Sequence, residues 1–365
     1  TTPYIALQLQ SVTLSFRVIS GGPESGGLND GATAFWVAAG MALFTILFGT
    51  RNVTANERHH GVVAAIAVEA LVKLFALIAV GLFAIYGISG GVGDVFSRVS
   101  PEFLHANDVF GVRWAALTFL SATAIICLPR QFQVTVVENV DERHLATASW
   151  LFPLYLVLIC IFVVPIAVAG LSHLPAGSNP DMFVLTLPLS ANQGGLATFA
   201  FIGGFSSATS MVIVAAIALS TMVSNHIVMP VALKVSQSGH YTSGDVRRLL
   251  LISRRVSIAV ILMLGFVYFR LTDGSEGLAS IGLIAFAGIA QVLPGVIGGV
   301  MWRGATRYGA LAGLAAGFGI WAYMLLIPSF RAEFAFIEAL VSMGPWGIAA
   351  LRPQAFLGMT VTDPL

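Results

Sequence analysis

Residues 195–229 read GLATFAFIGGFSSATSMVIVAAIALSTMVSNHIVM, and this stretch contains no Asp, Glu, Lys or Arg. It is longer than the roughly 20 apolar residues that a helix needs to cross the hydrocarbon core of a bilayer. The whole chain of 365 residues is 57% hydrophobic and only 10% charged, whereas soluble domains carry about 25% charged residues. This composition excludes a soluble enzyme and a disordered region, and it predicts an all-α polytopic membrane protein that lies in a lipid bilayer.

Seven further apolar stretches raise the prediction to eight full spans. The other seven are 31–50, 62–86, 114–129, 148–172, 257–271 (starting near Leu251), 277–302 and 308–330. Residues 1–19 resemble the rear half of one more span, truncated at its start. Because the chain begins with Thr rather than Met, we expect a piece of a longer protein. The predicted domain boundaries are therefore a transmembrane domain over 1–330 and an interfacial helix with a loop over 331–365, leading to a C-terminal region that is absent.

The distribution of Lys and Arg predicts the orientation of the spans. The loop that follows Lys234 carries Arg247, Arg248, Arg254 and Arg255, so the positive-inside rule places it in the cytoplasm. Alternation then puts the N-terminus of span 62–86 and the loop 130–147 on the same side. The net charge of +1 gives no reason to expect a nucleic-acid partner.

Glu69 and Lys73 are the only acidic and basic residues well inside a predicted span. They are four residues apart, so they share one helical face and can pair. A charge at membrane depth is costly, and it usually faces a cavity or a partner. Two interpretations stay open: a water-filled path for a cation or substrate, or a structural pair whose charges satisfy each other.

A cluster of hydroxyl residues lies inside the stretch 195–229, beside Gly203 and Gly204. Ser206, Thr209 and Ser210 are spaced i, i+3 and i+4, so they can direct oxygens to one point and are candidate Na⁺ ligands. The alternative is that these hydroxyls bond to carbonyls of their own helix or hold neighbouring helices together.

Pro129, Arg130 and Gln131 end the predicted span 114–129. A helix broken by proline leaves backbone groups free, and transporters use such breaks to bind substrate. The alternative is an ordinary helix end at the water interface. Nothing in the sequence has the pattern of a nucleophile triad, a P-loop or a dinucleotide loop, so we expect no enzyme activity and no organic cofactor in this chain.

Three stretches of the sequence resemble the sodium/solute symporter family. Residues 285–313, AFAGIAQVLPGVIGGVMWRGATRYGALAG, resemble the family's apolar helix with Pro, followed by Trp, basic residues, Thr and a Gly-Ala-x-x-Gly motif. Residues 2–10 (TPYIALQLQ) and 128–139 (LPRQFQVTVVEN) resemble the branch in which a symporter-like domain is fused to a sensor histidine kinase, as in CbrA-type, histidine-linked sensors. The likeness extends over the whole chain.

This resemblance implies a LeuT-type inverted-repeat core that lacks its first two core helices. It places Ser206, Thr209 and Ser210 in the cation site on the eighth core helix, and Pro129 to Gln131 at the break in the sixth, near substrate. Glu69 corresponds to an acid on the cation's exit path in the fifth helix. Lys73 departs from the family pattern, and because a fixed cation weakens the attraction for Na⁺, coupling to H⁺ stays open.

Two functions follow from these observations. The first is cation-coupled uptake, driven by Na⁺ or H⁺, of a small amino acid-like solute, for which the resemblance suggests histidine, across a bacterial inner membrane. The second is a ligand-sensing input domain in a two-component system, with kinase activity and a response-regulator partner belonging to the absent C-terminal region. A structural membrane protein without a ligand is a third, remote option.

Overall fold

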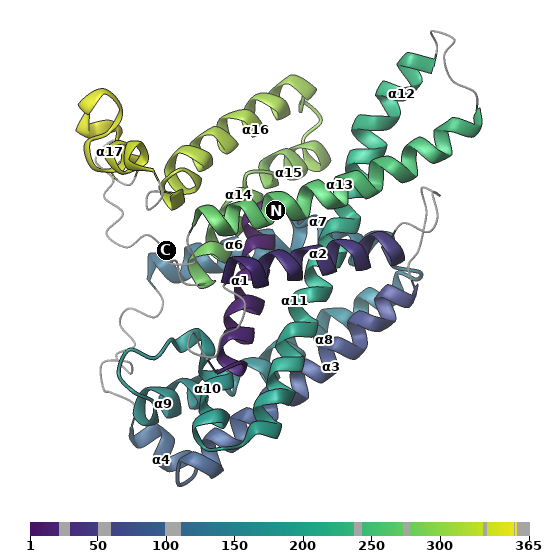
Figure 1. The fold of residues 1–365 in the computed structure, drawn as a ribbon. Coiled ribbons are helices and arrows are strands. Elements are labelled where there is room, and N and C mark those ends of the chain that lie inside the picture. The colour runs from purple at the N-terminus through teal and green to yellow at the C-terminus, as the bar shows by residue number, and fades with distance from the viewer. Residues whose placement is uncertain are drawn as a thin grey trace. The chain divides into compact units, whose positions relative to one another are not determined.

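The computed structural model describes residues 1–21, 30–49, 60–98, 111–236, 243–272, 278–330, 334–353 and 355. Within these ranges every regular element is helical (Figure 1). The chain divides into two compact units. Unit 1 comprises residues 1–7, 112–132 and 263–365, and unit 2 comprises residues 8–111 and 133–262. The prediction of one transmembrane domain over residues 1–330 stays a prediction.

Six of the described helices are long and apolar enough to cross a membrane. They cover Val63–Ile88, Arg143–His173, Gly194–Lys234, Arg248–Leu271, Leu278–Met301 and Arg307–Phe330. Each overlaps one of the spans expected from the sequence, so the expectation of an all-helical chain with several helices able to cross a membrane is confirmed.

The two other expected full spans have a different form. A bent pair of helices, Val112–Cys127 and Pro129–Val137, includes the expected span 114–129 and would make a seventh crossing if it forms one span. The expected span 31–50 corresponds to a shorter apolar helix, described over Gly31–Leu47. Residues 1–19, expected to be part of one more span, form the 18-residue helix α1 (Thr2–Ile19).

Helix α11 (Gly194–Val223) belongs to the most buried of the six candidate spans and has a continuous run of buried side chains from Val212 to Ala218. It packs against α2 (Asp30–Gly49), α3 (His60–Leu82) and α10 (Phe183–Ser190). The remaining elements of this unit include η2 (Phe83–Ile88), α4 (Val92–Ser97), η4 (Gln133–Val137), α8 (Arg143–Cys160), α9 (Val163–His173), η6 (Ser224–Val228), α12 (Met229–Ser236) and most of α13 (Ser243–Leu271).

Helix α14 (Leu278–Ala290) forms the centre of unit 1 and packs on α6 (Val112–Cys127). Ala124, Leu128 and Ile289 make a buried cluster between them. The indole of Trp321 donates a hydrogen bond to the carbonyl of Ile284 at 2.9 Å. The other elements are α7 (Pro129–Phe132), α15 (Leu293–Met301), α16 (Arg307–Trp321), η7 (Ala322–Leu326), η8 (Pro328–Phe330) and α17 (Ala335–Met343).

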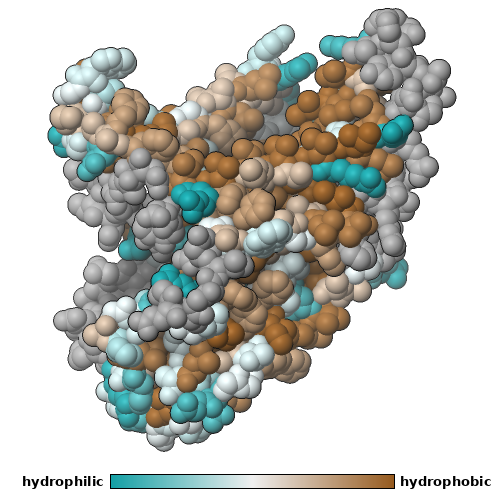
Figure 2. Space-filling view, viewed as in Figure 1, coloured by the Kyte–Doolittle hydropathy of each residue, from teal (hydrophilic) through white to brown (hydrophobic). Residues whose placement is uncertain are grey.

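The surface of the helices is strongly apolar, as expected for segments that face lipid. Figure 2 shows apolar residues across much of the drawn face, while hydrophilic residues gather at the end of unit 2 that carries α4 and α9. Helix α17 has nine residues, so it is about 14 Å long and too short to cross the bilayer. Its interfacial location stays a prediction, and residues 331–333, 354 and 356–365 of the expected C-terminal segment lie outside the described residues.

Candidate functional site

Helix α3 carries an apolar outer face and a charged inner one. Val68, Leu71 and Phe75 are all more than half exposed on the outside of the helix, where lipid would cover them. Glu69 and Lys73 belong to the opposite side and are only partly exposed. Placing a charged side chain at the centre of a membrane helix costs about 2.5–3.5 kcal/mol, so this side of α3 needs polar partners.

Those partners come from α11, which lies beside α3 (Figure 1). The hydroxyl of Ser210 donates to Oε2 of Glu69 at 2.7 Å. The ammonium group of Lys73 donates to the hydroxyl of Ser207 at 3.1 Å. We call these four side chains the polar quartet. The two charges predicted to share a face of one helix therefore both contact the same face of a second helix.

The backbones of the two helices approach closely beside the polar quartet. A Cβ atom built on Gly203 would lie 3.0 Å from the Cβ of Ala76 and 3.5 Å from the Cα of Lys73. Glycine at this position lets α11 approach α3 near enough for a short serine side chain to reach the ammonium group. Since higher numbers on α11 contact lower numbers on α3, the helices run antiparallel along a common seam.

A third helix contacts the same region of α3. The hydroxyl of Tyr155, on α8, donates to the backbone carbonyl of Ala70 at 3.1 Å. That carbonyl belongs to the residue directly after Glu69, so α8 holds the turn of α3 that carries the acid.

The predicted Na⁺ ligands have different partners in the structure. Ser206 donates to the carbonyl of Gly203 at 3.2 Å, and Thr209 donates to the carbonyl of Phe205 at 2.7 Å, both within α11. Of the three predicted ligands, only Ser210 reaches across to α3, although its hydroxyl also lies 3.2 Å from the carbonyl of Ser207. Their role as Na⁺ ligands stays a prediction. Among the described residues, no group of three or more His, Cys, Asp and Glu side chains is arranged to hold a metal ion.

The helix break at Pro129 belongs to unit 1, whereas the polar quartet belongs to unit 2. The chain bends by 49° at this break and then continues as a helix to Val137. The guanidinium carbon of Arg130 lies 5.3 Å from the centre of the Tyr4 ring, which is within the range of a cation–π contact. Gln131 is partly exposed beside it. Their predicted place on a substrate path stays a prediction.

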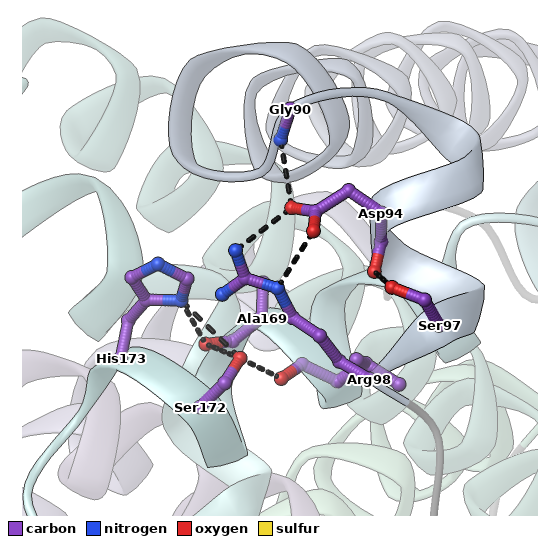
Figure 3. Close-up of polar contacts among 8 residues, drawn as sticks. Gly90, Asp94, Ser97, Arg98, Ala169, Ser172 and His173 are labelled. Carbon is purple, nitrogen blue, oxygen red and sulfur yellow. Dashed lines mark hydrogen bonds and ion pairs between the residues drawn. The ribbon is translucent and has the colours of Figure 1, made fainter.

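A second charged cluster lies outside the spans, where η2 leads into α4 (Figure 3). Asp94 accepts a hydrogen bond from the backbone N–H of Gly90 at 2.9 Å and forms an ion pair with Arg98 at 2.8 Å. The Gly90 hydrogen bond, followed by the Arg98 contact, lowers the pKa of Asp94 below its ordinary value. These contacts fix the turn between the two helices, and they hold no arrangement of groups suited to catalysis.

Sequence reasoning gave no role to Ser207, which is 6% exposed and holds Lys73. A signal for it was present, because Gly203, Ser207 and Ser210 are spaced i, i+4 and i+7 and so line one face of a helix. The small residue Gly203 marks that face as the one in close contact with a neighbour. The partner role of Tyr155 had no comparable signal.

Comparison of the chain with protein-family models, curated protein sequences and solved structures gave no match. No family is assigned. The resemblance to sodium/solute symporters therefore remains an expectation from the quoted motifs, and the function has to be argued from the polar quartet and its surroundings.

Proposed function

We propose that the chain is a transmembrane transporter domain that couples uptake of a small amino acid-like solute to entry of a cation by alternating access. The proposed setting is a bacterial inner membrane, and histidine is the first solute to test because of the resemblance described above. One observation carries the proposal: a carboxylate and an ammonium group lie within a membrane span and are hydrogen-bonded across a helix seam to hydroxyl groups.

A carboxylate with a hydroxyl group beside it is suited to receive a small cation. Glu69 offers negative charge, and Ser210 can rotate its hydroxyl so that the oxygen faces the ion instead of the carboxylate. Burial between helices strengthens the attraction because the local dielectric constant is lower than that of water. The hydrogen bond from Ser210 to Glu69 would break when a proton or Na⁺ binds. The bonded and broken forms are the two arrangements that alternating access requires.

Lys73 favours the proton over Na⁺ as the coupling ion. Its ammonium group already donates to Ser207, within the hydroxyl cluster that would otherwise surround Na⁺. A fixed positive charge there opposes the binding of any further cation, but Na⁺ also needs a shell of oxygen ligands, part of which Lys73 already uses, whereas protonation of Glu69 needs no such shell. The structural-pair interpretation would leave Glu69 and Lys73 indispensable for folding but irrelevant to any cation dependence.

The test is uptake of labelled histidine, and then of a mixture of other amino acids, by the full-length protein reconstituted in liposomes. Uptake driven by an inward proton gradient and independent of Na⁺ is the expected result. Uptake that requires Na⁺ would move the assignment to Ser206, Thr209 and Ser210. Binding without uptake would replace the transporter by the sensor input domain, and neither binding nor uptake of any solute would overturn both.

Glu69→Gln separates coupling from folding. The proposal predicts that this variant is expressed and monodisperse but has lost gradient-driven uptake. If the pair is only structural, the amount of folded protein falls while uptake per folded molecule is retained.

A further inference from the structure

The seam between α3 and α11 continues beyond the polar quartet into a half-enclosed hollow. Among the residues that the structure describes, seven side chains line it: Val63, Ile66, Gln133, Val134, Glu138, Val214 and Ile217. All of them belong to unit 2. Five of these seven are aliphatic, and the two polar ones are contributed by η4 and the residue that follows it.

The two polar side chains are joined to each other. Nε2 of Gln133 donates to Oε1 of Glu138 at 3.2 Å, and the backbone N–H of Glu138 donates to the carbonyl of Gln133 at 2.9 Å. The backbone bond has the i to i+5 spacing of a π-type turn, a local widening that often occurs at functional sites. This turn holds the carboxylate of Glu138 at the wall formed by α3 and α11.

The hollow lies next to the polar quartet along the same seam. Ile66 precedes Glu69 by three residues, and Val63 precedes Glu69 by six. These wall residues therefore lie about 4.5 and 9 Å from Glu69 along the axis of α3. On the facing helix, Val214 follows Ser210 by four residues. Val63 is the first residue of the apolar span of α3, which puts the hollow between one end of the span and Glu69.

The size and chemistry of the hollow define what it can take. Its volume, including the open side, is about 260 Å³, but its core admits only a water-sized particle. An amino acid-like solute is too large for that core. The carboxylate of Glu138 would repel an anion, whereas it would attract a small cation or a hydronium ion. Apolar walls strengthen that attraction because they keep the local dielectric constant low.

We propose that this hollow is a water-filled vestibule for a small monovalent cation, with Glu138 as its cation-attracting group and Glu69 as the next acid along the seam. The proposal rests on the function proposed above and adds a second binding site to it. On the predicted orientation the vestibule opens to the cytoplasm, so it would serve the release of the cation after transport.

Charge-selective labelling of single cysteines tests the vestibule without any measurement of transport. Cys127 and Cys160 are first replaced by serine, and Ile66→Cys or Ile217→Cys then introduces one thiol in the wall. Each variant, in membranes opened to both sides, is treated with a cationic and an anionic methanethiosulfonate of similar size. The ratio of the two rates is divided by the ratio for a free thiol in solution.

The expected normalised preference for the cationic reagent is about tenfold, from the attraction of one reagent and the repulsion of the other by a unit charge nearby. Glu138→Gln should abolish this preference, Glu138→Asp should keep it, and the matched variant Glu142→Gln, an exposed acid four residues further on, should leave it unchanged. High salt should reduce it in the unaltered Glu138 background. Val68→Cys, on the lipid-facing side of α3, should react with neither reagent.

Two results would overturn the vestibule. One is the absence of reaction at both wall positions with either reagent, which would mean a dry or lipid-filled gap. The other is reaction without a preference, or with a preference that neither Glu138→Gln nor salt reduces. Because labelling requires no transport, failure of the uptake experiment leaves this outcome intact, and cation-coupled uptake without selective labelling would overturn the vestibule alone.

Discussion

The contact between Glu69 and Ser210 should show a measurable coupling energy. We consider Glu69→Gln and Ser210→Ala, made singly and together. In the native protein the Ser210 hydroxyl donates to Oε2 of Glu69 at 2.7 Å, a short bond to a charged acceptor. Ser210→Ala removes the donor and leaves the carboxylate with less stabilisation at membrane depth. Once Glu69 is Gln, the same serine contributes less, so the effects of the two changes should not add.

The size of this coupling follows from two ranges. Hydrogen bonds to charged groups contribute about 1.5–3 kcal/mol in soluble proteins. Hydrogen bonds between membrane helices average about 0.6 kcal/mol and reach about 1.7 kcal/mol in double-mutant cycles. Because the contact is short and involves a carboxylate, we expect a coupling in the upper part of the membrane range, about 1–1.7 kcal/mol.

The assay is the free energy of unfolding of the four proteins in mixed micelles, titrated with a denaturing detergent. Thr209→Ala is the matched control, because its hydroxyl donates to the carbonyl of Phe205 within its own helix at 2.7 Å. Combined with Glu69→Gln, this control should be additive within about 0.5 kcal/mol. If the effects of Ser210→Ala and Glu69→Gln also add within about 0.5 kcal/mol, the contact is not a source of stability and Ser210 is removed from the polar quartet.

Three further changes have defined outcomes. Tyr155→Phe removes the hydrogen bond to the Ala70 carbonyl and should lower the free energy of unfolding by about 0.5–1.5 kcal/mol; no change in that free energy would mean that α8 does not hold α3 through this bond. Gly203→Val places side-chain atoms where even a Cβ is 3.0 Å from Ala76, so it should separate α3 from α11 and destabilise the protein by about 1–3 kcal/mol, measured against Gly204→Val, where a Cβ meets nothing within 4 Å. Native contacts lower the pKa of Asp94 below its ordinary value of 3.8, so its ionised form stabilises the fold above that pH and loses this contribution as pH falls through the native pKa. Asp94→Asn should therefore flatten the dependence of the unfolding temperature on pH below about 4, and an unchanged acid dependence would contradict the assignment.

The long apolar stretches made the helices predictable. Residues 195–229 could only be a buried or membrane helix by length and composition, and α11, η6 and the start of α12 occupy them. The segment 31–50 shows the limit of this reasoning, because a count of apolar residues does not say how far the helix that they form extends across the bilayer. Neither the LeuT-type repeat nor the absence of two core helices follows from the described fold.

The candidate site was predictable only in part. Spacing by four placed Glu69 and Lys73 on one face, and the cost of burying charge indicated that this face has a partner. Spacing alone did not show that Ser207 and Ser210, rather than Ser206 and Thr209, contact α3, because that depends on the rotation of α11 about its axis. The rotation is set by the close approach at Gly203, a contact between residues 127 or more positions apart. The hollow at Glu138 depends on a third segment and was equally out of reach.

Charge movement is the quantity that connects Glu69 to cation-coupled uptake. Proteoliposomes adsorbed to a solid-supported membrane report the displacement of charge when histidine, or a mixture of other amino acids, is added without an applied potential. We expect a transient inward movement of positive charge that Glu69→Gln abolishes and Thr209→Ala leaves intact. Solute entry without charge displacement, or a current of the same size in Glu69→Gln, would contradict a role for the polar quartet in carrying a cation.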